Sequence, residues 1–555
     1  MRHKILFLAI GAAMAASAAE TLPDLARPLD IPLYLSGNFG ELRPNHFHSG
    51  LDFKTQGRTG LPIHCADDGY VSRVVVSPWG FGRAVYVTHP ATGLTTVYGH
   101  LDSFARKIDE PVRKEQYNRE SFRVDLNFQP GEIPVKKGEV IARSGNSGSS
   151  GGPHLHMDVR DTKTEHALDP MPYFKKYIAD NVAPQMRSLA LYAVEGEGEV
   201  GTGARAVYNA TPGAVFKAWG KVIPGIKAYD RMTGTSNIYG VKYLTLTVDG
   251  KEVYRRVIDE VDFDSTRGVN TLIDYPDMSR RGSWVMTTDV PASRPLGEME
   301  IVGENMGVLN IDHERDYKCK WVMRDEHGNT ATVPFTIRGV KAPVARITPK
   351  GDRLNYQDKN TYRGEGFAVE LPAGTLYDDS YFTATATPSS TYLSPVVSVG
   401  NPDIPLAGNY TLAIDVKRDT LPDKRQYCIV RLGGKKTASV GGKYADGKVT
   451  TKVNRFGRYA VAADTKAPVI TPENKAAWGK TGRISYRIAD NLSGIDQYRC
   501  EIDGRWVMLE YDGKTGRFTY RLDPAHVTKG KPHKAVVTVT DACGNTSTST
   551  TTFNW

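Results

Sequence analysis

The chain has 555 residues, of which 40% are hydrophobic and 24% are charged. That length is enough for three or four domains of about 150 residues, each able to bury its own core. The formal net charge of +9 suits an anionic surface, although a solvated basic surface without a dedicated partner explains it equally well. Because Lys and Arg do not cluster among aromatic residues, nucleic acid is not an expected partner.

The first 18 residues have the features of a signal peptide. Basic residues at 2–4 precede the apolar run Ile5–Ala16, which is too short to span a bilayer comfortably, and small residues follow at 16–18. A membrane anchor is the alternative interpretation. No cysteine stands at the cleavage point and no later segment is apolar enough to cross a membrane. We therefore expect an exported protein of the periplasm, cell envelope or extracellular space, without a membrane span after signal removal.

Beyond residue 18 the sequence is rich in short segments that alternate polar and apolar residues. Arg83–Thr88 and Tyr243–Val248 are examples, and turn residues separate such segments. Alternation of this kind predicts half-buried β-strands. Helical periodicity is rare, and Pro170–Asp180 is the one short helix that we expect. The predicted fold class is therefore all-β, with several sandwich domains.

An internal repeat organises the C-terminal half of the chain. Val248–Lys251 and Ile502–Arg505 each contain an Asp-Gly pair that predicts a hairpin turn. Each repeat then ends in a similar polar turn, Asp325–Thr330 in one and Asp541–Thr546 in the other. The repeat predicts two immunoglobulin-like β-sandwiches, at residues 190–340 and 466–555.

Two similar segments that contain proline predict the linkers between these domains. Lys341–Val344 and Lys466–Val469 both have the sequence Lys-Ala-Pro-Val, in which Pro disfavours a continuing strand or helix. The region between them, residues 345–463, is predicted to be a third β-rich domain, with strands at Phe367–Pro372 and Tyr459–Ala462.

The number of cysteines is odd, so at least one of them is unpaired within the chain. Cys500 and Cys543 lie in the same predicted domain and could form a disulfide in an exported protein. The complete set is Cys65, Cys319, Cys428, Cys500 and Cys543.

One candidate strand carries two histidines on the same face. Side chains alternate along a strand, so one face of the segment from 153 to 160 presents His154, His156, Asp158 and Arg160. Two neighbouring imidazoles on a polar face are costly to hold without a partner. A divalent cation is the usual partner, and the combination of His with carboxylate suits zinc. A solvated pair on an outer face is the alternative.

Two further elements have the same residue types but are weak signals by themselves. His48 is followed four residues later by Asp52, and Tyr98 and His100 share one face of another candidate strand. A lone His is usually structural, and a His with a nearby acid occurs by chance in a chain of this composition. The three elements indicate a metal site only when they are taken together.

Taken together, these elements closely resemble the lysostaphin/LytM-type zinc metallopeptidases, which hydrolyse peptides of bacterial peptidoglycan. Order and approximate spacing agree over about residues 30–180, which is less than a third of the chain. The matching segments are His48–Phe53, Gly60–Ile63, Ala66–Val71, Tyr98–Leu101, Val135–Ala142, Ser144–Gly148 and Gly152–His156.

The resemblance implies a role for each of five residues. It implies that His48, Asp52 and His156 bind one zinc ion. It implies that His154 and His100 act on the reacting carbonyl. It also implies a metallopeptidase domain at residues 19–183, built on a small antiparallel β-sheet with the site in a groove.

The chemistry agrees with this division of roles. Three protein ligands leave a fourth zinc position for water, which is the catalytic arrangement, and a His with a pKa near 6.5 can take the proton of that water. We expect His154 to be the general base and His100 to stabilise the oxyanion, although the two roles could be exchanged. No His-Glu-x-x-His helix is present, so a glutamate base is not supported.

Two departures from the family pattern bear on the substrate groove. A charged insertion at 109–130 could form a wall of the groove, and residues 42–47 contain no tyrosine, which several family members have there. His46 could be mistaken for a ligand, and the family match favours His48. The segment 145–152 is rich in glycine but lacks the lysine of a phosphate-binding loop, so we expect a turn that lines the groove.

The leading functional expectation is an exported zinc endopeptidase that cuts peptide cross-links or stem peptides of peptidoglycan. The β-sandwich domains would then bind envelope partners or position the catalytic domain. Two alternatives are a catalytically retired scaffold protein and a metallopeptidase that acts on protein substrates. Whether the bond is a D-alanyl cross-link or lies in a glycine bridge stays open.

Overall fold

The computed structural model describes residues 22–296, 300–434 and 437–555, so the expected signal peptide lies outside the described residues. Strands dominate, which confirms the all-β fold class. The α-helices are α1 (Arg106–Asn118), α2 (Met171–Phe174), α3 (Tyr275–Arg281) and α4 (Trp478–Thr481). Short 3-10 turns are η1 (Lys175–Tyr177), η2 (Thr266–Thr271), η3 (Glu304–Gly307), η4 (Lys424–Gln426) and η5 (Lys475–Ala477). Over the described ranges, none of these helices has the length and apolar character needed to cross a membrane.

The first unit, residues 22–183, is built on one large antiparallel sheet. Its central path runs, in spatial order, through β1 (Leu35–Gly37), β4 (Leu51–Lys54), β13 (His154–Asp161), β8 (Leu94–Gly99), β7 (Arg83–His89), β6 (Gly69–Val76) and β10 (Val124–Asn127). Shorter strands of this unit are β2 (Leu42–Arg43), β3 (His46–Phe47), β5 (Pro62–His64), β9 (Ser103–Phe104), β11 (Pro134–Val135), β12 (Val140–Arg143) and β14 (Ala167–Leu168). The helix expected near 170–180 is present as α2 and η1.

The second unit, residues 184–340, contains a ten-stranded sheet and also extends the sheet of the first unit. Its strand β20 (Glu260–Val261) pairs with β14 of the first unit. The main path is β16 (Ala206–Asn209), β15 (Gln185–Val200), β17 (Val215–Tyr229), β25 (Thr330–Gly339), β24 (Asp316–Arg324), β18 (Tyr243–Val248), β19 (Lys251–Val257) and β22 (Glu300–Gly303). Two short strands, β21 (Met286–Thr287) and β23 (Leu309–Ile311), pair with β17.

The third unit, residues 345–463, has two five-stranded sheets and one small pair. The first sheet is β27 (Asn360–Gly364), β28 (Phe367–Leu371), β32 (Tyr410–Asp415), β36 (Lys448–Val453) and β35 (Lys443–Ala445). The second sheet is β30 (Ala384–Thr387), β31 (Val396–Val399), β37 (Gly457–Ala463), β33 (Tyr427–Leu432) and β34 (Ala438–Ser439), and the pair is β26 (Asp352–Leu354) with β29 (Ser380–Phe382). Both strands that the sequence predicted in this unit are present.

The fourth unit, residues 466–555, consists of two four-stranded sheets. One is β38 (Val469–Pro472), β39 (Arg483–Ala489), β43 (Arg517–Arg521) and β42 (Glu510–Asp512). The other is β41 (Arg505–Trp506), β40 (Ile495–Ile502), β44 (Pro532–Asp541) and β45 (Thr546–Asn554). Alternate residues of these strands face the core between the sheets, which explains the alternation in the sequence.

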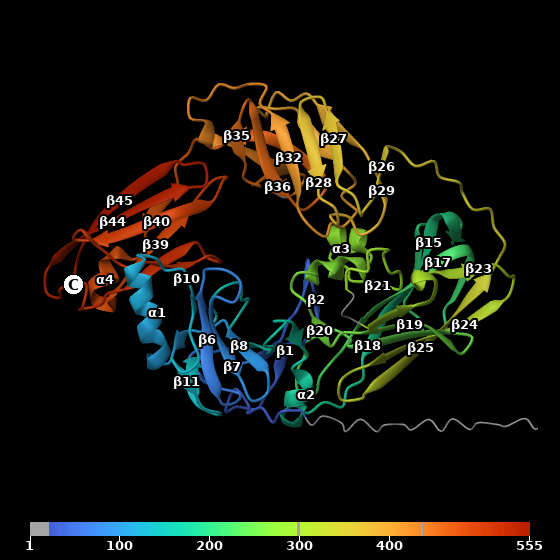
Figure 1. Cartoon of the computed structure of the whole chain (residues 1–555), viewed down its shortest axis with the longest axis horizontal. Coiled ribbons are helices and arrows are strands. Elements are labelled where there is room, and N and C mark those ends of the chain that lie inside the picture. The colour runs from blue at the N-terminus through green and yellow to red at the C-terminus, as the bar shows by residue number, and fades with distance from the viewer. Residues whose placement is uncertain (1–21, 297–299, 435–436) are drawn as a thin grey trace, which may run out of the picture.

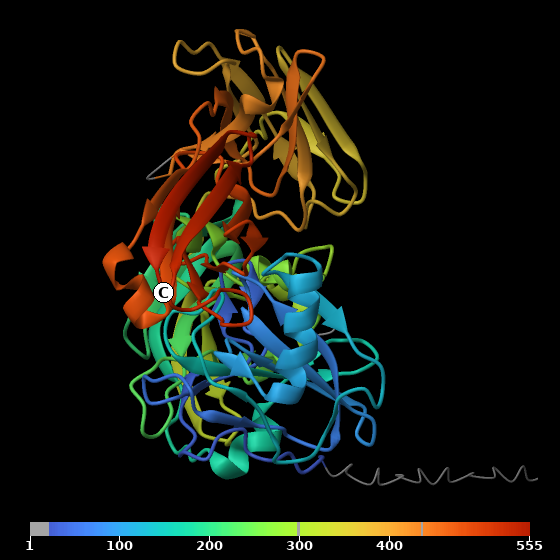
Figure 2. The same cartoon turned by 90° about the vertical axis from the view of Figure 1, so that its left-hand side faces the viewer.

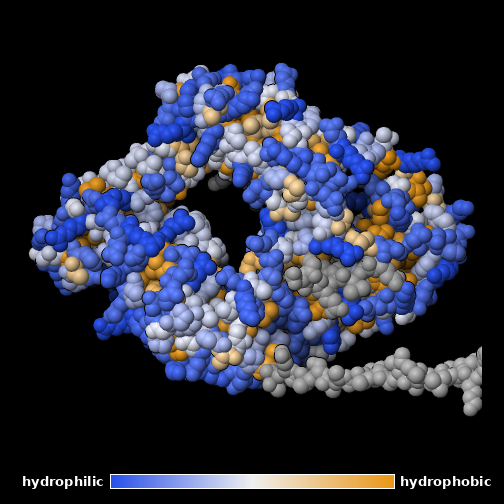
Figure 3. Space-filling model, in the orientation of Figure 1, coloured by the Kyte–Doolittle hydropathy of each residue, from blue (hydrophilic) through white to orange (hydrophobic). Residues whose placement is uncertain are grey.

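Each unit has its own buried core, and the first core also receives residues from other units. Ile258 and Val261 of the second unit and Met508 of the fourth pack on the core of the first unit. The four units follow one another around a ring, so that the fourth returns to the first beside α1 (Figure 1; the perpendicular view is Figure 2). The space-filling view shows an opening in the middle of this ring (Figure 3).

Both predicted Asp-Gly hairpin turns are present. Asp249 and Gly250 join β18 to β19 with φ of 50° and 83°, and Asp503 and Gly504 join β40 to β41 with φ of 51° and 80°. Positive φ at both central residues is the backbone of a type I′ turn, which matches the twist of the paired strands. Gly at the second position avoids the steric cost of a side chain there.

The disulfide considered between Cys500 and Cys543 is not formed. All five cysteines are free and buried. Cys500 belongs to the core of the fourth unit, whereas Cys543 packs with Cys428 of the third unit. Cys500 lies on a strand and Cys543 in a turn, and these elements place the two side chains in different cores. Their proximity in the sequence does not reveal this.

The charged insertion at 109–130 forms most of helix α1 and the strand β10, where no helix was expected. Pro111 lies inside α1 and interrupts the pattern by which helices are recognised from sequence. The helix does not stand free as a wall: Arg113 forms an ion pair with Asp523 at 2.8 Å, and the ring of Tyr117 stacks on His526. The insertion is therefore a docking surface for the fourth unit.

Candidate metal centre

Three neighbouring strands bring the predicted site residues together. In the register of the sheet, His156 of β13 lies opposite Asp52 of β4 on one side and Gly99 of β8 on the other. His48 lies in the turn that leads into β4. Gly50 in that turn is required by packing, since a Cβ there would lie 2.3 Å from the carbonyl oxygen of Met157. Backbone pairing thus fixes residues that are about 100 positions apart in the sequence.

The three predicted ligands converge on one point. His48 Nε2 lies 3.0 Å from Asp52 Oδ1 and 3.1 Å from His156 Nδ1, and the last two atoms are 2.9 Å apart. Ligands about 2.1 Å from a tetrahedral zinc ion are separated by about 3.4 Å. Donor type, number and spacing therefore fit a zinc ion, and this group could hold a metal.

Each ligand histidine is oriented by a hydrogen bond from its other ring nitrogen. His48 Nδ1 lies 2.6 Å from the carbonyl oxygen of Asn38, and His156 Nε2 lies 2.6 Å from Asp158 Oδ1. Asp158 is fully buried and also accepts hydrogen bonds from Ser49 and Arg160. Such partners fix the tautomer that leaves the metal-facing nitrogen unprotonated.

The charges of the site alter the pKa values of its members. Burial raises the pKa of Asp52, but the surrounding histidines outweigh it and hold that pKa well below its usual range. Burial lowers the pKa of His156, yet the carboxylates of Asp158 and Asp52 raise it to about 9. Since only the neutral imidazole binds a metal, a metal ion at this site replaces the proton of His156.

His154 and His100 lie beside the three ligands. His154 Nε2 is 3.3 Å from Asp52 Oδ1, and the rings of His154 and His100 have centroids 4.7 Å apart. Nδ1 of His154 lies 2.8 Å from the carbonyl oxygen of Gly152, and Nδ1 of His100 lies 2.9 Å from that of Ser147. An Nδ1–H that donates to a carbonyl leaves the Nε2 lone pair free. In both histidines Nε2 is therefore a hydrogen-bond acceptor.

The environment of His100 keeps its ring neutral. Burial, together with the neighbouring His156 and His154, lowers the pKa of His100 to about 3. Its backbone has a φ of 59°, a left-handed conformation that is uncommon outside glycine. The hydrogen bond from its amide to the carbonyl of Phe81 helps to hold this conformation, which turns the ring toward the other histidines.

The structure brings all five predicted site residues into one cluster and leaves His46 outside it. His46 is exposed, and the hydrogen bond of its ring is to the carbonyl of Pro44. The sequence placed Asp158 on the same strand face as His156 but assigned it no role. A carboxylate two residues after a ligand histidine is close enough to accept its hydrogen bond, and that spacing was the available signal. Asn38 and Ser147 orient His48 and His100 through their backbone carbonyls. Every residue has such a carbonyl, so these two partners could not be predicted from residue type. The segment 145–152 lines the site as expected.

A distant unit lies against the edge of this site. Lys514 of the fourth unit donates a hydrogen bond to the carbonyl of Asn146, and Glu510 forms an ion pair with Arg83 at 2.7 Å. The ring of Trp79 packs edge-on against Tyr511. These contacts fall on the two loops that hold Phe81 and Ser147, so the fourth unit contributes to the rim around the histidines.

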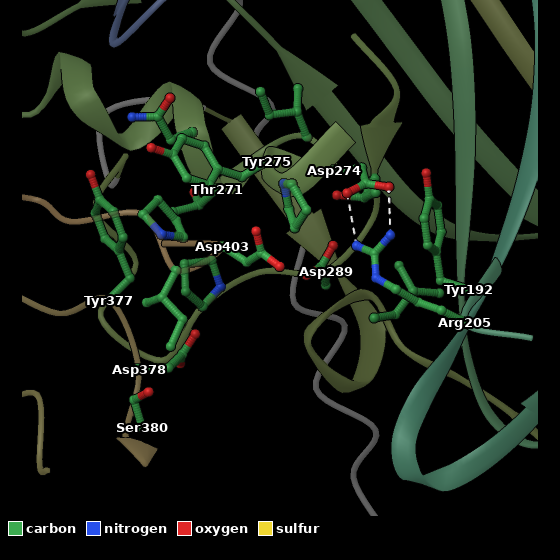
Figure 4. Close-up of a pocket in the computed structure, with 18 of the residues that line it drawn as sticks. Tyr192, Arg205, Thr271, Asp274, Tyr275, Asp289, Tyr377, Asp378, Ser380 and Asp403 are labelled. Atoms are coloured by element: carbon green, nitrogen blue, oxygen red, sulfur yellow. Dashed lines mark hydrogen bonds and ion pairs between the residues drawn. The ribbon is translucent and has the colours of Figure 1, made fainter. Parts of the chain in front are cut away.

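A separate pocket of about 440 Å³ lies between the second and third units, away from the histidines. Arg205 is held there by a two-pronged ion pair with Asp274 at 2.7 and 2.9 Å (Figure 4). Asp289 and Asp378 also line the pocket, and burial raises the pKa of each. No histidine lines this pocket, so it differs in chemistry from the metal centre.

Replacing Asp158 by Asn is expected to weaken zinc binding by about 10- to 100-fold. The neutral amide accepts the hydrogen bond of His156 Nε2–H less strongly, so the opposite nitrogen becomes a poorer metal ligand. Affinity is measured by competition with a chromophoric chelator. Asp125→Asn, which removes an exposed partner of Arg73 in the same unit, serves as the control, and equal affinities for both variants would contradict the role of Asp158.

Comparison with known proteins finds metallopeptidases. The chain is 34% identical over 119 residues to an uncharacterized metalloprotease of Haemophilus influenzae, a match that covers 21% of this chain and 19% of that protein. It is 30% identical over 113 residues to the DD-carboxypeptidase/endopeptidase Mpg of Neisseria meningitidis serogroup B, with 20% of each chain covered. The chain thus spans about a fifth of the length of these curated relatives. A family model for a Zu5-like domain matches residues 351–464.

Among solved structures, the chain is similar to the catalytic domain of the prophage-encoded M23 protein EnpA from Enterococcus faecalis, with 25% identity and a TM-score of 0.18 over 25% of this chain and 89% of that domain. It is also similar to the catalytic domain of lysostaphin from Staphylococcus simulans, with 23% identity and a TM-score of 0.19 over 25% and 89%. The curated relatives are metallopeptidases, and one region of this chain is similar to them, in agreement with the predicted resemblance.

Proposed function

We propose that residues 19–183 form an exported zinc-dependent endopeptidase that hydrolyses peptide cross-links or stem peptides of bacterial peptidoglycan. The observation that carries this proposal is the convergence of His48, Asp52 and His156 within about 3 Å of one another, beside two further histidines. Peptidoglycan is the proposed substrate because the relative from Neisseria meningitidis is named as a DD-carboxypeptidase/endopeptidase.

In this proposal His48, Asp52 and His156 hold the zinc ion. A zinc ion held there would supply Lewis-acid polarisation of the scissile carbonyl and would lower the pKa of water toward about 7. His154 takes the proton of the attacking water at Nε2, since its Nδ1–H donates to Gly152. The same nitrogen then returns the proton to the leaving amine.

His100 is proposed to stabilise the oxyanion. It can donate from Nε2 only when both ring nitrogens are protonated, because Nδ1 faces the carbonyl of Ser147. Its low pKa opposes this in the resting site. Negative charge that develops on the carbonyl oxygen favours the imidazolium, so His100 would take its second proton at Nε2 from solvent and donate that N–H to the oxyanion as the reaction proceeds.

The remaining units are proposed to position this domain on the envelope. The boundaries that we propose are 190–340, 345–463 and 466–555, with immunoglobulin-like sandwiches for the first and last. The separate hydrophobic cores of these regions support the division.

The proposal is tested by digestion of isolated peptidoglycan with mass analysis of the released fragments. His154→Ala is expected to reduce the rate of release by about 100- to 10,000-fold, because general-base catalysis is lost. The matched control is His46→Ala, which removes an exposed imidazole two residues from a ligand and is expected to keep full activity.

Equal release by wild type and His154→Ala would defeat the assignment and favour the scaffold alternative. A casein-like protein is digested in parallel. Cleavage of casein without cleavage of peptidoglycan would instead identify a peptidase for protein substrates. The masses of the fragments decide between D-alanyl cross-links and glycine bridges.

A further inference from the structure

Two clusters of aspartates recur at equivalent positions in the second and fourth units. The first Asp triad is Asp180, Asp230 and Asp325, and the second Asp triad is Asp464, Asp490 and Asp541. In each triad, one ligand atom per carboxylate lies within 4.8 Å of the corresponding atoms of the other two. Neither triad belongs to the metallopeptidase site, and nothing in the proposed hydrolysis uses them.

The two triads occupy the same places in the chain path of their units. The first member precedes the opening strand by five residues in both cases, with Asp180 before β15 and Asp464 before β38. The second member directly follows a strand, with Asp230 after β17 and Asp490 after β39. The third member is the first residue of the polar turn found in the sequence repeat, Asp325 in Asp325–Thr330 and Asp541 in Asp541–Thr546.

The hydrogen bonds that hold the third members are also duplicated. Asn329 donates its backbone N–H to Asp325 Oδ1 at 2.9 Å and its side-chain amide to Asp325 Oδ2 at 2.8 Å. Asn545 makes the same two bonds to Asp541, at 2.9 and 2.8 Å. Each Asn also donates to the backbone carbonyl of the first member, Asp180 or Asp464. The repeat therefore preserves a three-dimensional arrangement of carboxylates.

The carboxylates lack cationic partners. Among the described residues, no Lys, Arg or His forms an ion pair with any of the six. Lys242 and His327 line the cavity at the first triad, but Lys242 pairs with Asp169 and Glu326, and His327 bonds to the carbonyl of Ile178. Three carboxylates whose oxygens lie within 4.8 Å of one another repel when all are ionised, and a bound cation would offset that repulsion.

Buried oxygens in both triads are left without a partner. Asp230 is 1% exposed. Within the part of the chain that the structure describes, its carboxylate accepts a hydrogen bond at Oδ1 from the N–H of Arg231 and none at Oδ2. Asp180 Oδ2 and Asp490 Oδ1 are buried and have no hydrogen-bond partner. At the first triad, Asp180, Asp230 and Asp325 line a small cavity of about 20 Å³, which has room for one ion or water. Burial and the neighbouring carboxylates raise the pKa of Asp230 to about 8.

We propose that each Asp triad binds one calcium ion. Two oxygens that are each about 2.4 Å from a central calcium ion lie at most about 4.8 Å apart. The triads meet this limit, since their ligand atoms lie within 4.8 Å of one another. Ligands that consist of carboxylate oxygens suit a hard cation, whereas zinc favours sites with His or Cys. The site is distinct from the zinc centre in both its residues and its chemistry.

Calcium would fix the geometry between units. The first triad joins Asp180, at the end of the first unit, to strand ends of the second, and its cavity is also lined by Asn38 of the first unit. The second triad joins Asp464, between the third and fourth units, to the strand ends of the fourth. An ion in each triad therefore ties a connecting segment to the sandwich that follows it, and so stiffens the ring.

The test is calcium titration of the full-length protein after chelator treatment and zinc reloading, by calorimetry and by metal analysis. Wild type is expected to bind two calcium ions, Asp230→Asn and Asp490→Asn one each, and the double variant none. Zinc content is expected to stay the same in all four. The controls are Asp259→Asn and Asp496→Asn, which replace exposed carboxylates of the same two units and are expected to leave two sites.

Thermal unfolding gives a second readout that does not require the variants. Calcium at about ten times Kd is expected to raise the Tm of the second unit by roughly 3–6 °C and that of the smaller fourth unit by roughly 6–11 °C. Magnesium, which demands smaller octahedral sites, is expected to do so less. Absence of calcium binding by wild type, or equal binding by wild type and the double variant, would overturn the proposal. Because peptidoglycan hydrolysis is not measured, failure here is separate from failure of the peptidase assignment.

Discussion

His156→Ala is expected to lose its bound zinc and to hydrolyse peptidoglycan at least about 1,000-fold more slowly than wild type. His156 is the central ligand: it is 3% exposed and contacts both His48 and Asp52. A loss of about 4 kcal/mol of transition-state stabilisation gives this factor, and Lewis-acid catalysis supplies several kcal/mol. Metal analysis of the purified variant and fragment release from peptidoglycan measure the two effects.

Two observations would contradict this expectation. One is a His156→Ala variant that keeps stoichiometric zinc, and the other is a wild-type enzyme whose rate is unchanged by a chelator. His64→Ala is the control, because His64 pairs with Asp30 outside the cluster and is expected to keep both zinc and activity. Circular dichroism of all variants separates loss of metal from loss of fold.

Trp321→Ala is expected to destabilise the second unit by about 3–5 kcal/mol, the usual cost of truncating a large buried aromatic side chain. Trp321 is 0% exposed at the centre of β24, and its ring packs edge-on against Tyr254. Denaturant unfolding followed by tryptophan fluorescence measures the change, with the transition of this unit analysed separately because a chain of several domains does not unfold in two states.

The matched control replaces Tyr208, which is 45% exposed in the same unit. Tyr208→Ala is expected to cost less than about 1 kcal/mol, since surface substitutions cause small changes. Equal losses for the two variants would show that the second unit does not depend on the core around Trp321. Since β20 of this unit extends the sheet of the first, the Trp321 variant is also expected to weaken the contact between them.

The strands and turns of this protein were largely predictable because their signals are local. Side chains of a strand alternate between faces, so the segments at Arg83–Thr88 and Tyr243–Val248 revealed β7 and β18. Asp249-Gly250 and Asp503-Gly504 predicted their hairpins because few other residue pairs adopt the required positive φ. Helix α1 was missed because Pro111 and a highly charged sequence obscure its apolar face.

The candidate metal site was predictable for a different reason. Its ligands are few, chemically distinctive and held on short motifs, so that His48, Asp52 and His156 stand out when taken with the resemblance to known metallopeptidases. Partners that act through backbone carbonyls, such as Asn38 and Ser147, have no such signal. The contact of Lys514 with the loop at Asn146 joins residues that are 368 positions apart, and no local pattern predicts it.

The sequence alone determined the all-β class, the hairpin turns and the identity of the residues that can bind a metal, because these depend on side-chain chemistry and on spacing along one or two strands. Only the tertiary structure decided how the fourth unit meets the rim around the histidines, which cysteines lie together and how six aspartates form two triads. Those contacts arise from packing between elements that are distant in the chain, and their energies depend on burial and mutual position, which residue order does not specify.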